Sequence, residues 1–491
     1  MFETGIPNLD LILGGGIPEG DVLLMVGPPG SGKTTLALQM AFHTALSGQN
    51  ALYISTLSES PTTLVRHIRA FSFFDESLIG KKLFLLNIYP LIKQDLGKVV
   101  DMLIQEVKAR EAKLVIIDGM MTIHDLHPGA WEMRAFIYEL GATLATLDCT
   151  TIVTSSAIEH AIEHQFPEFT VADGIVELGK QDIGAQTVRT IKVGKIRGLA
   201  PILGQHSLRI DSGGITVFPR IESVFELQDI GISPKRVSLG LPELDAMAFG
   251  GLPAGSVTVL AGALGTGKTL ICLHYIMEGA RQGEKGLMVG FRETPRLLID
   301  KARGFGMDLE AAIRDGLVTI LHIPPTDATI NEITWKILSE VERFAPQRLA
   351  LDSLTELEQA VFDERHQRRY MATLVNLLRS KDITSLMAKE IPQIVGPELD
   401  FSDTPLAFLA ENLVLLRFVE FRGELLHIIS ILKMRDTDHD YSIRQCIIND
   451  KGLKVLGRIE TAEGVLTGIA RLTTEMRVKG RTSEPRRERG S

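Results

Sequence analysis

The chain has 491 residues, a hydrophobic content of 45% and a formal net charge of −9. This length exceeds what one ordinary core encloses, so we expect two or three domains. The acidic balance argues against a globally basic surface for nucleic acid or an anionic membrane. Cys149, Cys272 and Cys446 are far apart and suggest neither a zinc site nor a disulfide framework, and the chain opens without a secretory signal. These features predict a soluble cytoplasmic protein.

Short apolar runs alternate with helical patterns in the first part of the chain. The apolar runs, predicted to be strands, lie at 22–26, 51–55, 82–86, 113–118 and 151–155. The helical patterns lie at 34–47, 60–71, 95–110 and 131–146. The strands lack polar alternation, which is typical of strands buried on both faces of a parallel sheet. Strand–helix alternation predicts an α/β sheet with helices on both faces.

After about residue 180 the pattern changes to hairpin-like strands. These are predicted at 187–194, 206–210 and 215–217. Farther along, residues 246–267 carry no charge, a length that suits a membrane span. They also hold six glycines and Pro253, so they are interpreted as a turn, a strand and a phosphate-binding loop.

The whole pattern occurs twice. G-P-P-G-S-G-K-T at 27–34 recurs as G-A-L-G-T-G-K-T at 262–269, an offset of 235 from residue 27 to residue 262. T-G-I-P-N-L-D at 4–10 recurs as L-G-L-P-E-L-D at 239–245 with the same offset. A repeat of this length indicates two copies of a whole domain rather than a solenoid.

The repeat sets the predicted domain plan. We predict tandem RecA-like P-loop domains over 1–222 and 237–460, joined by a linker at 223–236. Each is expected to be a mostly parallel sheet with helices on both faces and a C-terminal β-hairpin region. The tail, 461–491, is predicted to hold a short helix at 464–472 and then a disordered basic end.

Both glycine-rich loops have the Walker A pattern, and each lies between an apolar strand and a helix. Backbone N–H groups of such a loop face the β-phosphate at a helix N-terminus. Lys33 and Lys268 are expected to reach the β- and γ-phosphates of ATP, and Thr34 and Thr269 to bind Mg²⁺. The predicted nucleotide-binding residues are Gly27, Pro28, Pro29, Gly30, Ser31, Gly32, Lys33, Thr34 and Thr35 in the first domain and Gly262, Ala263, Leu264, Gly265, Thr266, Gly267, Lys268, Thr269 and Leu270 in the second.

An aspartate ends the same strand in each copy. Asp118 ends L-V-I-I-D, and Asp352 ends L-A-L-D. A buried carboxylate at the end of a strand is costly unless it holds a metal or caps a helix. In P-loop proteins it is the Walker B acid, linked to Mg²⁺. Asp118 and Asp352 are therefore predicted metal ligands together with the two threonines.

Hydrolysis also needs a group that orients and deprotonates water. In RecA-type domains it follows the strand next to the phosphate loop, which favours Glu59 and Glu293 as catalytic residues. The alternative is that these glutamates only open a helix, since E-S-P and E-T-P also suit helix starts.

A Lys-x-Arg pair ends each copy: Lys195 with Arg197, and Lys433 with Arg435. On a strand, residues two apart point to the same face. Such a pair of cations could neutralise γ-phosphate charge across a subunit boundary, as an arginine finger does. From the residues alone, a solvated strand edge or an incidental anion site is the favoured interpretation.

The motif order, repeated twice, resembles the KaiC family of double-domain RecA-type ATPases. F-R-E-T-P at 291–295, V-E-F-R-G-E at 419–424 and K-M-R-D-T-D-H-D at 433–440 are similar to that family's second domain, and the resemblance covers roughly 3–460. It implies a homo-hexameric double ring with ATP and Mg²⁺ bound between subunits. It also implies that Lys195, Arg197, Lys433, Arg435 and His439 reach ATP in the neighbouring subunit.

The chain departs from the clock members of that family at three places. They carry two adjacent glutamates where this chain has Ser58-Glu59 and Arg292-Glu293, which puts the catalytic base in question. They also autophosphorylate a Ser and a Thr where this chain has Ala407 and Phe408. Neither side chain has a hydroxyl, so autophosphorylation at that site is excluded.

The function predicted first is a slowly hydrolysing, ATP-dependent ring that acts as a regulatory or signalling scaffold. A protein partner is expected, and the tail after residue 461 is a candidate docking segment, although a solvated disordered end explains it equally well. A nucleic-acid motor is disfavoured by the acidic charge and the lack of an aromatic-basic stretch. A non-hydrolysing ATP-held ring, and an autokinase with an acceptor elsewhere, stay open as alternatives.

Overall fold

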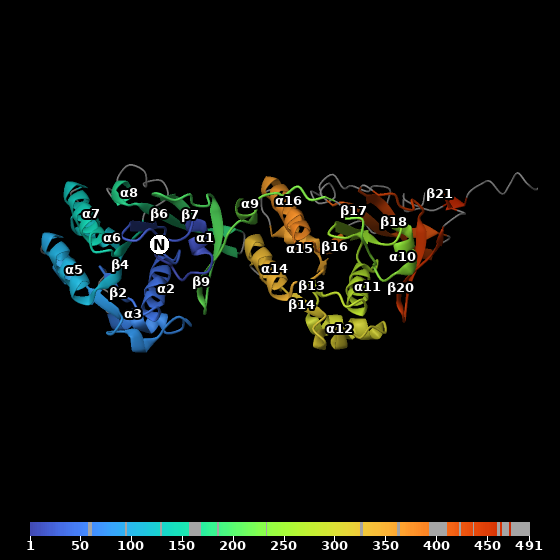
Figure 1. The fold of residues 1–491 in the computed structure, drawn as a ribbon, viewed down its shortest axis with the longest axis horizontal. Coiled ribbons are helices and arrows are strands. Elements are labelled where there is room, and N and C mark those ends of the chain that lie inside the picture. Colours follow the sequence, from blue (N-terminus) through green and yellow to red (C-terminus); the bar gives the residue numbers. More distant parts are fainter. Residues whose placement is uncertain are drawn as a thin grey trace, which may run out of the picture. The chain divides into compact units, whose positions relative to one another are not determined.

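The computed structural model describes most of the chain. It covers residues 1–491 except 57–60, 94–95, 128–129, 157–167, 184–185, 232, 325–327, 361–363, 392–409, 422–423, 436, 459–461, 464–470 and 473–491. The chain divides into two compact units, Met1–Val224 and Phe225–Ser491. Each unit contains one nine-stranded sheet with helices packed on it (Figure 1).

The sheet of the first unit has the order β3-β2-β4-β5-β1-β6-β7-β8-β9. Its parallel part, up to β6, consists of β1 (Val22–Val26), β2 (Asn50–Ser55), β3 (Leu83–Asn87), β4 (Ala112–Asp118), β5 (Thr150–Ser155) and β6 (Gly174–Ile183). Its antiparallel part continues with β7 (Gln186–Ile196), β8 (Gln205–Asp211) and β9 (Gly214–Phe218). The predicted strands are all present.

Helices cover both faces of this sheet. They are α1 (Leu9–Leu13), α2 (Lys33–Leu46), α3 (Pro61–Ile68), α4 (Tyr89–Ile92), α5 (Leu96–Arg110), α6 (Met120–Leu126), α7 (Ala130–Ala145), α8 (Glu168–Val171) and α9 (Ile221–Val224). Along β1, Leu23 and Met25 join the core beneath α2, whereas Leu24 and Val26 join the core beneath α5 and α7. Strand residues alternate between faces, so both faces of β1 are apolar and the strand lacks polar alternation.

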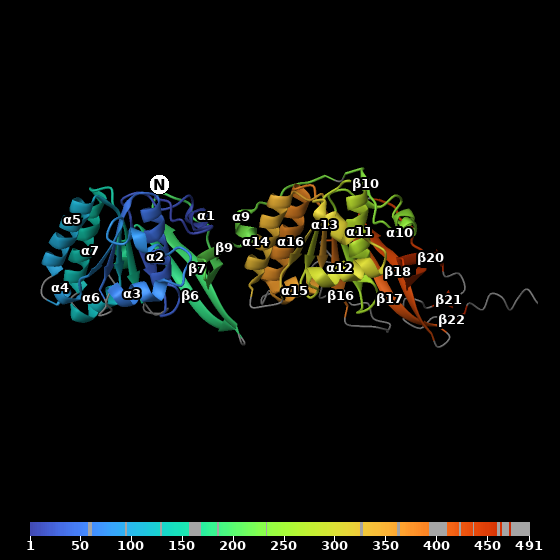
Figure 2. The same cartoon turned by 90° about the horizontal axis from the view of Figure 1, so that it is seen from below.

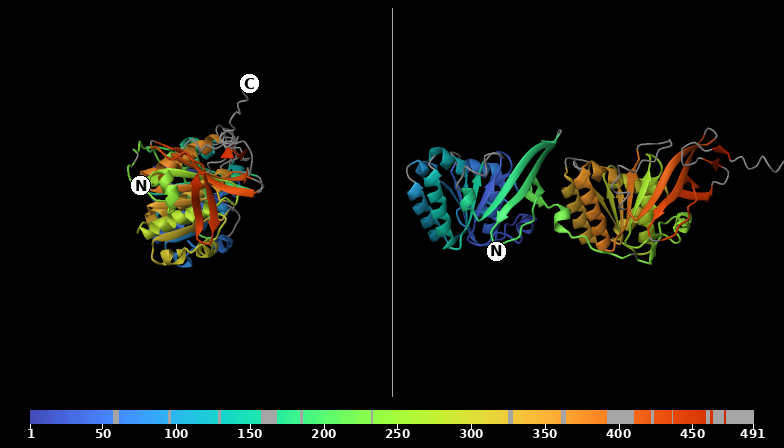
Figure 3. Two further views of the ribbon diagram at one scale, coloured as in Figure 1. Left: turned by 90° about the vertical axis from the view of Figure 1, so that its right-hand side faces the viewer. Right: turned by 90° about the horizontal axis from the view of Figure 1, so that it is seen from above.

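The second unit repeats this strand order as β14-β13-β15-β16-β12-β17-β18-β19-β20. Its strands are β12 (Val257–Gly262), β13 (Gly286–Gly290), β14 (Val318–His322), β15 (Arg348–Asp352), β16 (Thr384–Glu390), β17 (Asn412–Phe421), β18 (Glu424–Met434), β19 (Arg444–Asn449) and β20 (Gly452–Arg458). Its helices are α10 (Pro242–Met247), α11 (Lys268–Arg281), α12 (Pro295–Gly304), α13 (Leu309–Arg314), α14 (Ile330–Phe344), α15 (Leu354–Gln359) and α16 (Glu364–Ser380). The long hairpins β6–β7 and β17–β18 occupy equivalent places (Figures 2 and 3). The two units are therefore copies of one mostly parallel α/β fold of the RecA type.

The segment predicted to link the two domains packs against the second unit over part of its length. The backbone of Gln228 exchanges hydrogen bonds with the Asn376 side chain of α16, at 2.9 and 2.8 Å. Arg379, also on α16, donates to the carbonyl oxygen of Ile230 at 2.7 Å. Short strands β10 (Arg236–Val237) and β11 (Leu252–Pro253) then pair with each other.

Two predicted features lie in the less regular parts. Within 246–267, β11 and β12 precede the phosphate loop, and none of the described helices has the length and apolar composition of a bilayer span. In the tail, β21 (Ala462–Glu463) pairs with β22 (Arg471–Leu472). The last two residues of the helix predicted at 464–472 are therefore extended, so the prediction is wrong there. The rest of the predicted tail helix, 464–470, lies outside the described residues.

Candidate nucleotide-binding sites

Each Walker A loop connects the central strand of its sheet to a long helix. In the first unit β1 leads through the loop into α2, and in the second β12 leads into α11. Gly32 and Gly267, just before the two lysines, have φ of 111° and 96°, a left-handed conformation that glycine adopts without steric cost. A β-carbon on Gly267 would lie 2.9 Å from the Leu453 side chain, so a larger residue would not fit there.

The two Walker A lysines lie folded along their own loops. Lys33 donates to the carbonyl oxygens of Gly27 and Pro28 at 2.6 and 3.1 Å. Lys268 donates to those of Gly262 and Ala263 at 2.7 and 2.8 Å. Burial lowers the pKa of both lysines, and the nearby Walker B acid partly counters that effect. A buried ammonium group beside a ring of backbone N–H groups is suited to a phosphate.

The structure brings each predicted threonine and aspartate together. Thr34 donates its hydroxyl to Asp118 at 2.8 Å, and Thr269 donates to Asp352 at 2.5 Å. Asp118 ends β4, next to β5, and is buried. Asp352 ends β15, next to β16, and is half-buried. Burial raises the pKa of the Asp352 carboxyl. Hydroxyl and carboxylate oxygens are the donors that Mg²⁺ prefers, so the two pairs fit that ion.

Two further hydroxyls contact Asp118 that the sequence analysis did not select. Tyr53 on β2 and Thr154 on β5 both donate short hydrogen bonds to its carboxylate. Polar residues in the otherwise apolar runs A-L-Y-I-S and T-I-V-T-S were the available signal. At the equivalent places in the second unit stand Met288 and Ala388, which donate nothing.

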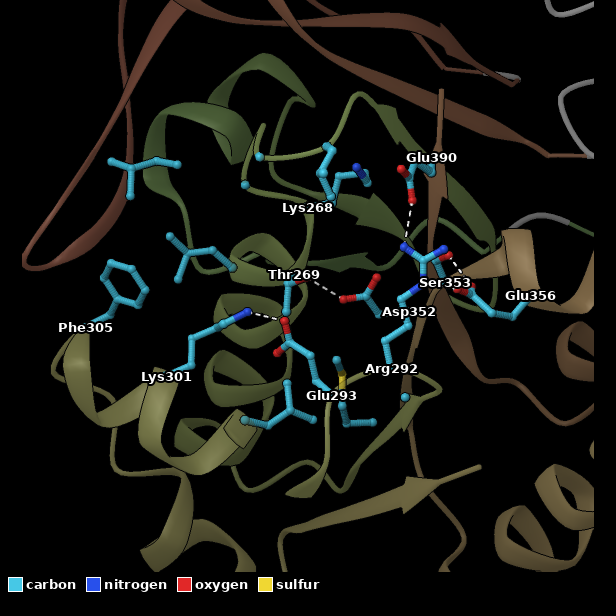
Figure 4. A pocket seen from close by; sticks show the side chains of 18 residues that line it. Lys268, Thr269, Arg292, Glu293, Lys301, Phe305, Asp352, Ser353, Glu356 and Glu390 are labelled. Atoms are coloured by element: carbon cyan, nitrogen blue, oxygen red, sulfur yellow. Dashed lines mark hydrogen bonds and ion pairs between the residues drawn. The ribbon is translucent and has the colours of Figure 1, made fainter. Parts of the chain in front are cut away.

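A cavity of about 410 Å³ opens beside the second Walker A loop (Figure 4). It is lined by the loop itself, by Glu293 and Asp352, and by apolar groups that include Phe305 and Ile448. Its volume lies within the range of small-ligand pockets. A lining with both charged and apolar groups suits a ligand with a phosphate chain and a planar base.

The catalytic candidates are unequally placed. Glu59 lies outside the described residues. Glu293 lines the cavity, where one carboxylate oxygen forms an ion pair with Lys301 of α12 (Figure 4). Lys301, another residue that the sequence analysis did not select, is replaced by His67 in the first unit, 234 positions earlier.

Arg292 does not stand free beside the phosphate loop. Its guanidinium lies 2.6 Å from a carboxylate oxygen of Glu356 and 3.2 Å from one of Glu390. Neither glutamate is a predicted site residue, because neither belongs to a recognisable motif and 64 and 98 positions separate them from Arg292 in the chain. The fold brings them together: Arg292 follows β13, Glu356 lies on α15 just after β15, Glu390 ends β16, and these three strands are parallel neighbours.

In each sheet, the Lys-x-Arg pair lies at the opposite end of the strands from the Walker A loop. Arg197 pairs with Asp173 at 2.6 Å, and Asp173 accepts a hydrogen bond from the backbone of Val22, the first residue of β1. Arg435 occupies the equivalent place, where its backbone donates to Glu411 and Glu411 accepts from Val257, the first residue of β12.

The lysines of these pairs donate hydrogen bonds to backbone carbonyl oxygens at that same end of the strands. Lys195 donates to Phe169 at 3.2 Å, and Lys433 donates to Ala410 at 2.8 Å. His439 is only 5% exposed, packs against the tilted ring of Tyr441 with ring centroids 4.2 Å apart, and has no hydrogen-bond partner for either ring nitrogen among the described residues. None of these contacts involves the Walker A loop of the same unit.

Comparisons with known proteins match the two units to one family. The model of the family "ATPase: KaiC" matches residues 2–222 and 237–460. The circadian clock oscillator protein KaiC of Picosynechococcus sp. is 29% identical over 477 residues, which cover 95% of this chain and 92% of that protein. The KaiC protein of Prochlorococcus marinus is 28% identical over 490 residues, covering 98% and 97%. The duplicated fold, the two Walker sites and these matches place the chain in the KaiC family of ATPases.

Proposed function

We propose that this KaiC-family chain binds ATP with Mg²⁺ at both Walker sites, hydrolyses it slowly, and serves as a nucleotide-dependent regulatory scaffold. One observation carries the proposal above all others. In both units a buried lysine lies along its glycine-rich loop while a threonine hydroxyl meets an aspartate beside it. Packing alone does not require a buried lysine and a threonine–aspartate pair at the same place in both units.

The residues take distinct roles in this proposal. Lys33 and Lys268 leave their loop carbonyls to bind the β- and γ-phosphates. Thr34 with Asp118, and Thr269 with Asp352, hold Mg²⁺ or its water ligands. The ion, when bound, offsets charge on the phosphate oxygens. Glu59 and Glu293 orient and deprotonate the attacking water.

The placement of the Lys-x-Arg pairs supports a ring of six subunits. A strand rises about 3.3 Å per residue, so the length of β1 or β12 separates each pair from the loop of its own unit. The pairs therefore serve a site on another subunit in this proposal, as the family resemblance implies. The matched relatives are named clock oscillator proteins, which supports a regulatory role for this chain, with a protein partner and in the cytoplasm.

One observation favours a second candidate, a ring that holds ATP without turning it over. Glu293 is paired with Lys301, and the position before it is an arginine tied to two glutamates. A base that is held by a lysine must exchange that partner before it can activate water.

Steady-state ATP hydrolysis separates the two candidates. The proteins compared are the wild type, Glu59→Gln, Glu293→Gln and the double variant, with assembly mass recorded for each. We expect slow turnover in the wild type, reduced at least about tenfold by one or both substitutions while the assembly stays intact. Binding and assembly without turnover above the double variant would instead identify an ATP-held ring.

A further inference from the structure

The charged trio around Arg292 has an inner and an outer partner. Glu356 is 8% exposed and its carboxylate lies 2.6 Å from the arginine Nε, whereas Glu390 is 28% exposed and lies 3.2 Å from a terminal nitrogen. Ser353 also donates a hydrogen bond to Glu356 and fixes its position. Figure 4 shows the guanidinium between the two carboxylates. The contact to Glu390 is thus the longer and more solvated of the two.

The fold does not require these charges. The equivalent positions in the first unit, 234 residues earlier, are Ser58, Thr122 and Ser156, which carry only hydroxyls. The second unit therefore has an arginine together with two carboxylates that compensate it, where the first has three small neutral side chains.

The trio faces the place where a terminal phosphate would lie. Glu390 is the register partner of Gly262, the first residue of the Walker A loop. Arg292, Glu356, Glu390 and Lys268 all line the same cavity. The charges of Glu390 and Arg292 both act on the Lys268 ammonium group, in opposite directions. A phosphate that binds Lys268 therefore comes within the electrostatic reach of Arg292.

We propose that Arg292 is a γ-phosphate ligand of the second site, which Glu390 holds in the nucleotide-free chain and yields to ATP. Arginine binds phosphate through two parallel hydrogen bonds that are shorter and stronger than a long, solvated contact to a carboxylate. Glu356 keeps its contact and anchors the guanidinium during the exchange. ADP lacks the γ-phosphate and leaves the trio closed, so the second site discriminates ATP from ADP through this residue. The inference rests on the proposed function, because it assumes that the second site binds these nucleotides.

The test compares ATP and ADP affinities at the second site alone. A Lys33→Ala background disables the first Walker loop, and each nucleotide competes with a fluorescent ADP analogue. In that background we expect Arg292→Ser to lower the ratio of ATP to ADP affinity at least about tenfold, since one charged hydrogen-bond pair is lost with ATP only. Glu390→Gln should raise the ratio about threefold, because a competing carboxylate is removed.

Arg303→Ser is a matched control. Like Arg292, Arg303 is exposed and lies between two carboxylates, 2.8 Å from Asp300 and 3.0 Å from Glu310, but it does not line the cavity. Its loss should leave the affinity ratio unchanged. The triple variant Arg292→Ser, Glu356→Thr, Glu390→Ser restores the hydroxyl set of the first unit and leaves no unpaired buried charge. It should show the same loss of discrimination as Arg292→Ser.

The outcomes separate the inference from the proposal beneath it. An unchanged ratio in both Arg292→Ser and the triple variant, with both nucleotides still bound, would overturn the role of Arg292 and leave the proposed function standing. If the Lys33→Ala protein binds neither nucleotide while Lys33→Ala with Lys268→Ala has the same fold, the proposed function fails for the second site, and the inference fails with it.

Discussion

Single residues distinguish the two Walker B acids. Among the described residues, the Asp118 carboxylate accepts hydrogen bonds from Thr34, Tyr53 and Thr154, whereas that of Asp352 accepts one, from Thr269. Several hydroxyl donors around one carboxylate fix its orientation more fully than a single donor does. The orientation of the Walker B carboxylate is therefore fixed more rigidly in the first site than in the second.

The Tyr53 hydroxyl is the sharpest probe of this difference. We expect Tyr53→Phe, in a Lys268→Ala background, to raise the Mg²⁺ concentration needed for half-maximal ATP binding about tenfold or more, because one hydrogen bond to a charged group is worth about 1.5–3 kcal/mol. A Mg²⁺ titration with a fluorescent ATP analogue measures this. Met288→Leu in the second site is the control at the equivalent position, and an unchanged Mg²⁺ requirement in Tyr53→Phe would contradict the role given to that hydroxyl.

Asp21 gives the first unit a pH dependence. Burial, together with the charge of Asp173, raises the pKa of its carboxyl to about 6, from about 3.9 in an unfolded chain. A raised pKa means that the ionised form disfavours folding, so the stability of the unit falls as pH rises from about 4 through 6. The second unit has Ser256 at this place.

Thermal unfolding of Asp21→Asn checks the sign. We expect the variant to unfold at a higher temperature than the wild type at pH 7.5, with a gap that narrows as the pH falls to 5. Asp101→Asn, on the exposed side of α5, is the control and should show no pH-dependent gap. A gap that widens toward acid would contradict the assignment.

At the scale of elements, one buried arginine ties the second unit together at the start of β15. Arg348 is fully buried, pairs with Glu284 at 2.7 Å, and donates to the carbonyl oxygens of Ser238 and Tyr275 at 2.7 and 3.0 Å. It thereby links α11 and β15 to the residue that follows β10. The first unit has Leu114 at the equivalent position.

Removal of this arginine should destabilise the second unit strongly. For Arg348→Met we expect a loss of about 3–5 kcal/mol in the free energy of unfolding, because Glu284 and the carbonyl groups lose their partner. Trp335 fluorescence during urea unfolding, in a Trp131→Phe background, reports on that unit. Arg281→Met removes an exposed arginine that pairs with Glu278 and should cost less than about 1 kcal/mol. Equal losses for the two variants would show that burial of Arg348 does not matter.

The elements that the sequence predicts well are those with one dominant pattern. Runs such as 22–26 and 113–118 are apolar on both faces and become β1 and β4. By contrast β6 was not among the predicted strands, because only alternate residues such as Val176 and Leu178 are buried. The same limit applies to the site. The Walker residues belong to recognisable local motifs, whereas Glu356 on α15 and Glu390 at the end of β16 have no such motif and reach Arg292 only through the packing of three parallel strands.

At the scale of the whole molecule, the separation of each Lys-x-Arg pair from its own Walker loop predicts shared sites between chains. Coexpression of two inactive second-site variants tests this, both in a Lys33→Ala background: one with Lys268→Ala and one with Lys433→Ala and Arg435→Ala. If the pair acts on a neighbour, about a quarter of the interfaces in a random mixed ring regain both halves, and hydrolysis returns. No recovery in verified mixed assemblies would indicate that the pair acts within its own chain.

The central claim is that one chain carries two working ATP sites. It is tested most directly by counting the ATP molecules bound per chain, in the presence of Mg²⁺, for the wild type, Lys33→Ala, Lys268→Ala and the double variant. The account predicts two, one, one and none. A wild type that binds fewer than two, or single variants that both still bind two, would contradict it.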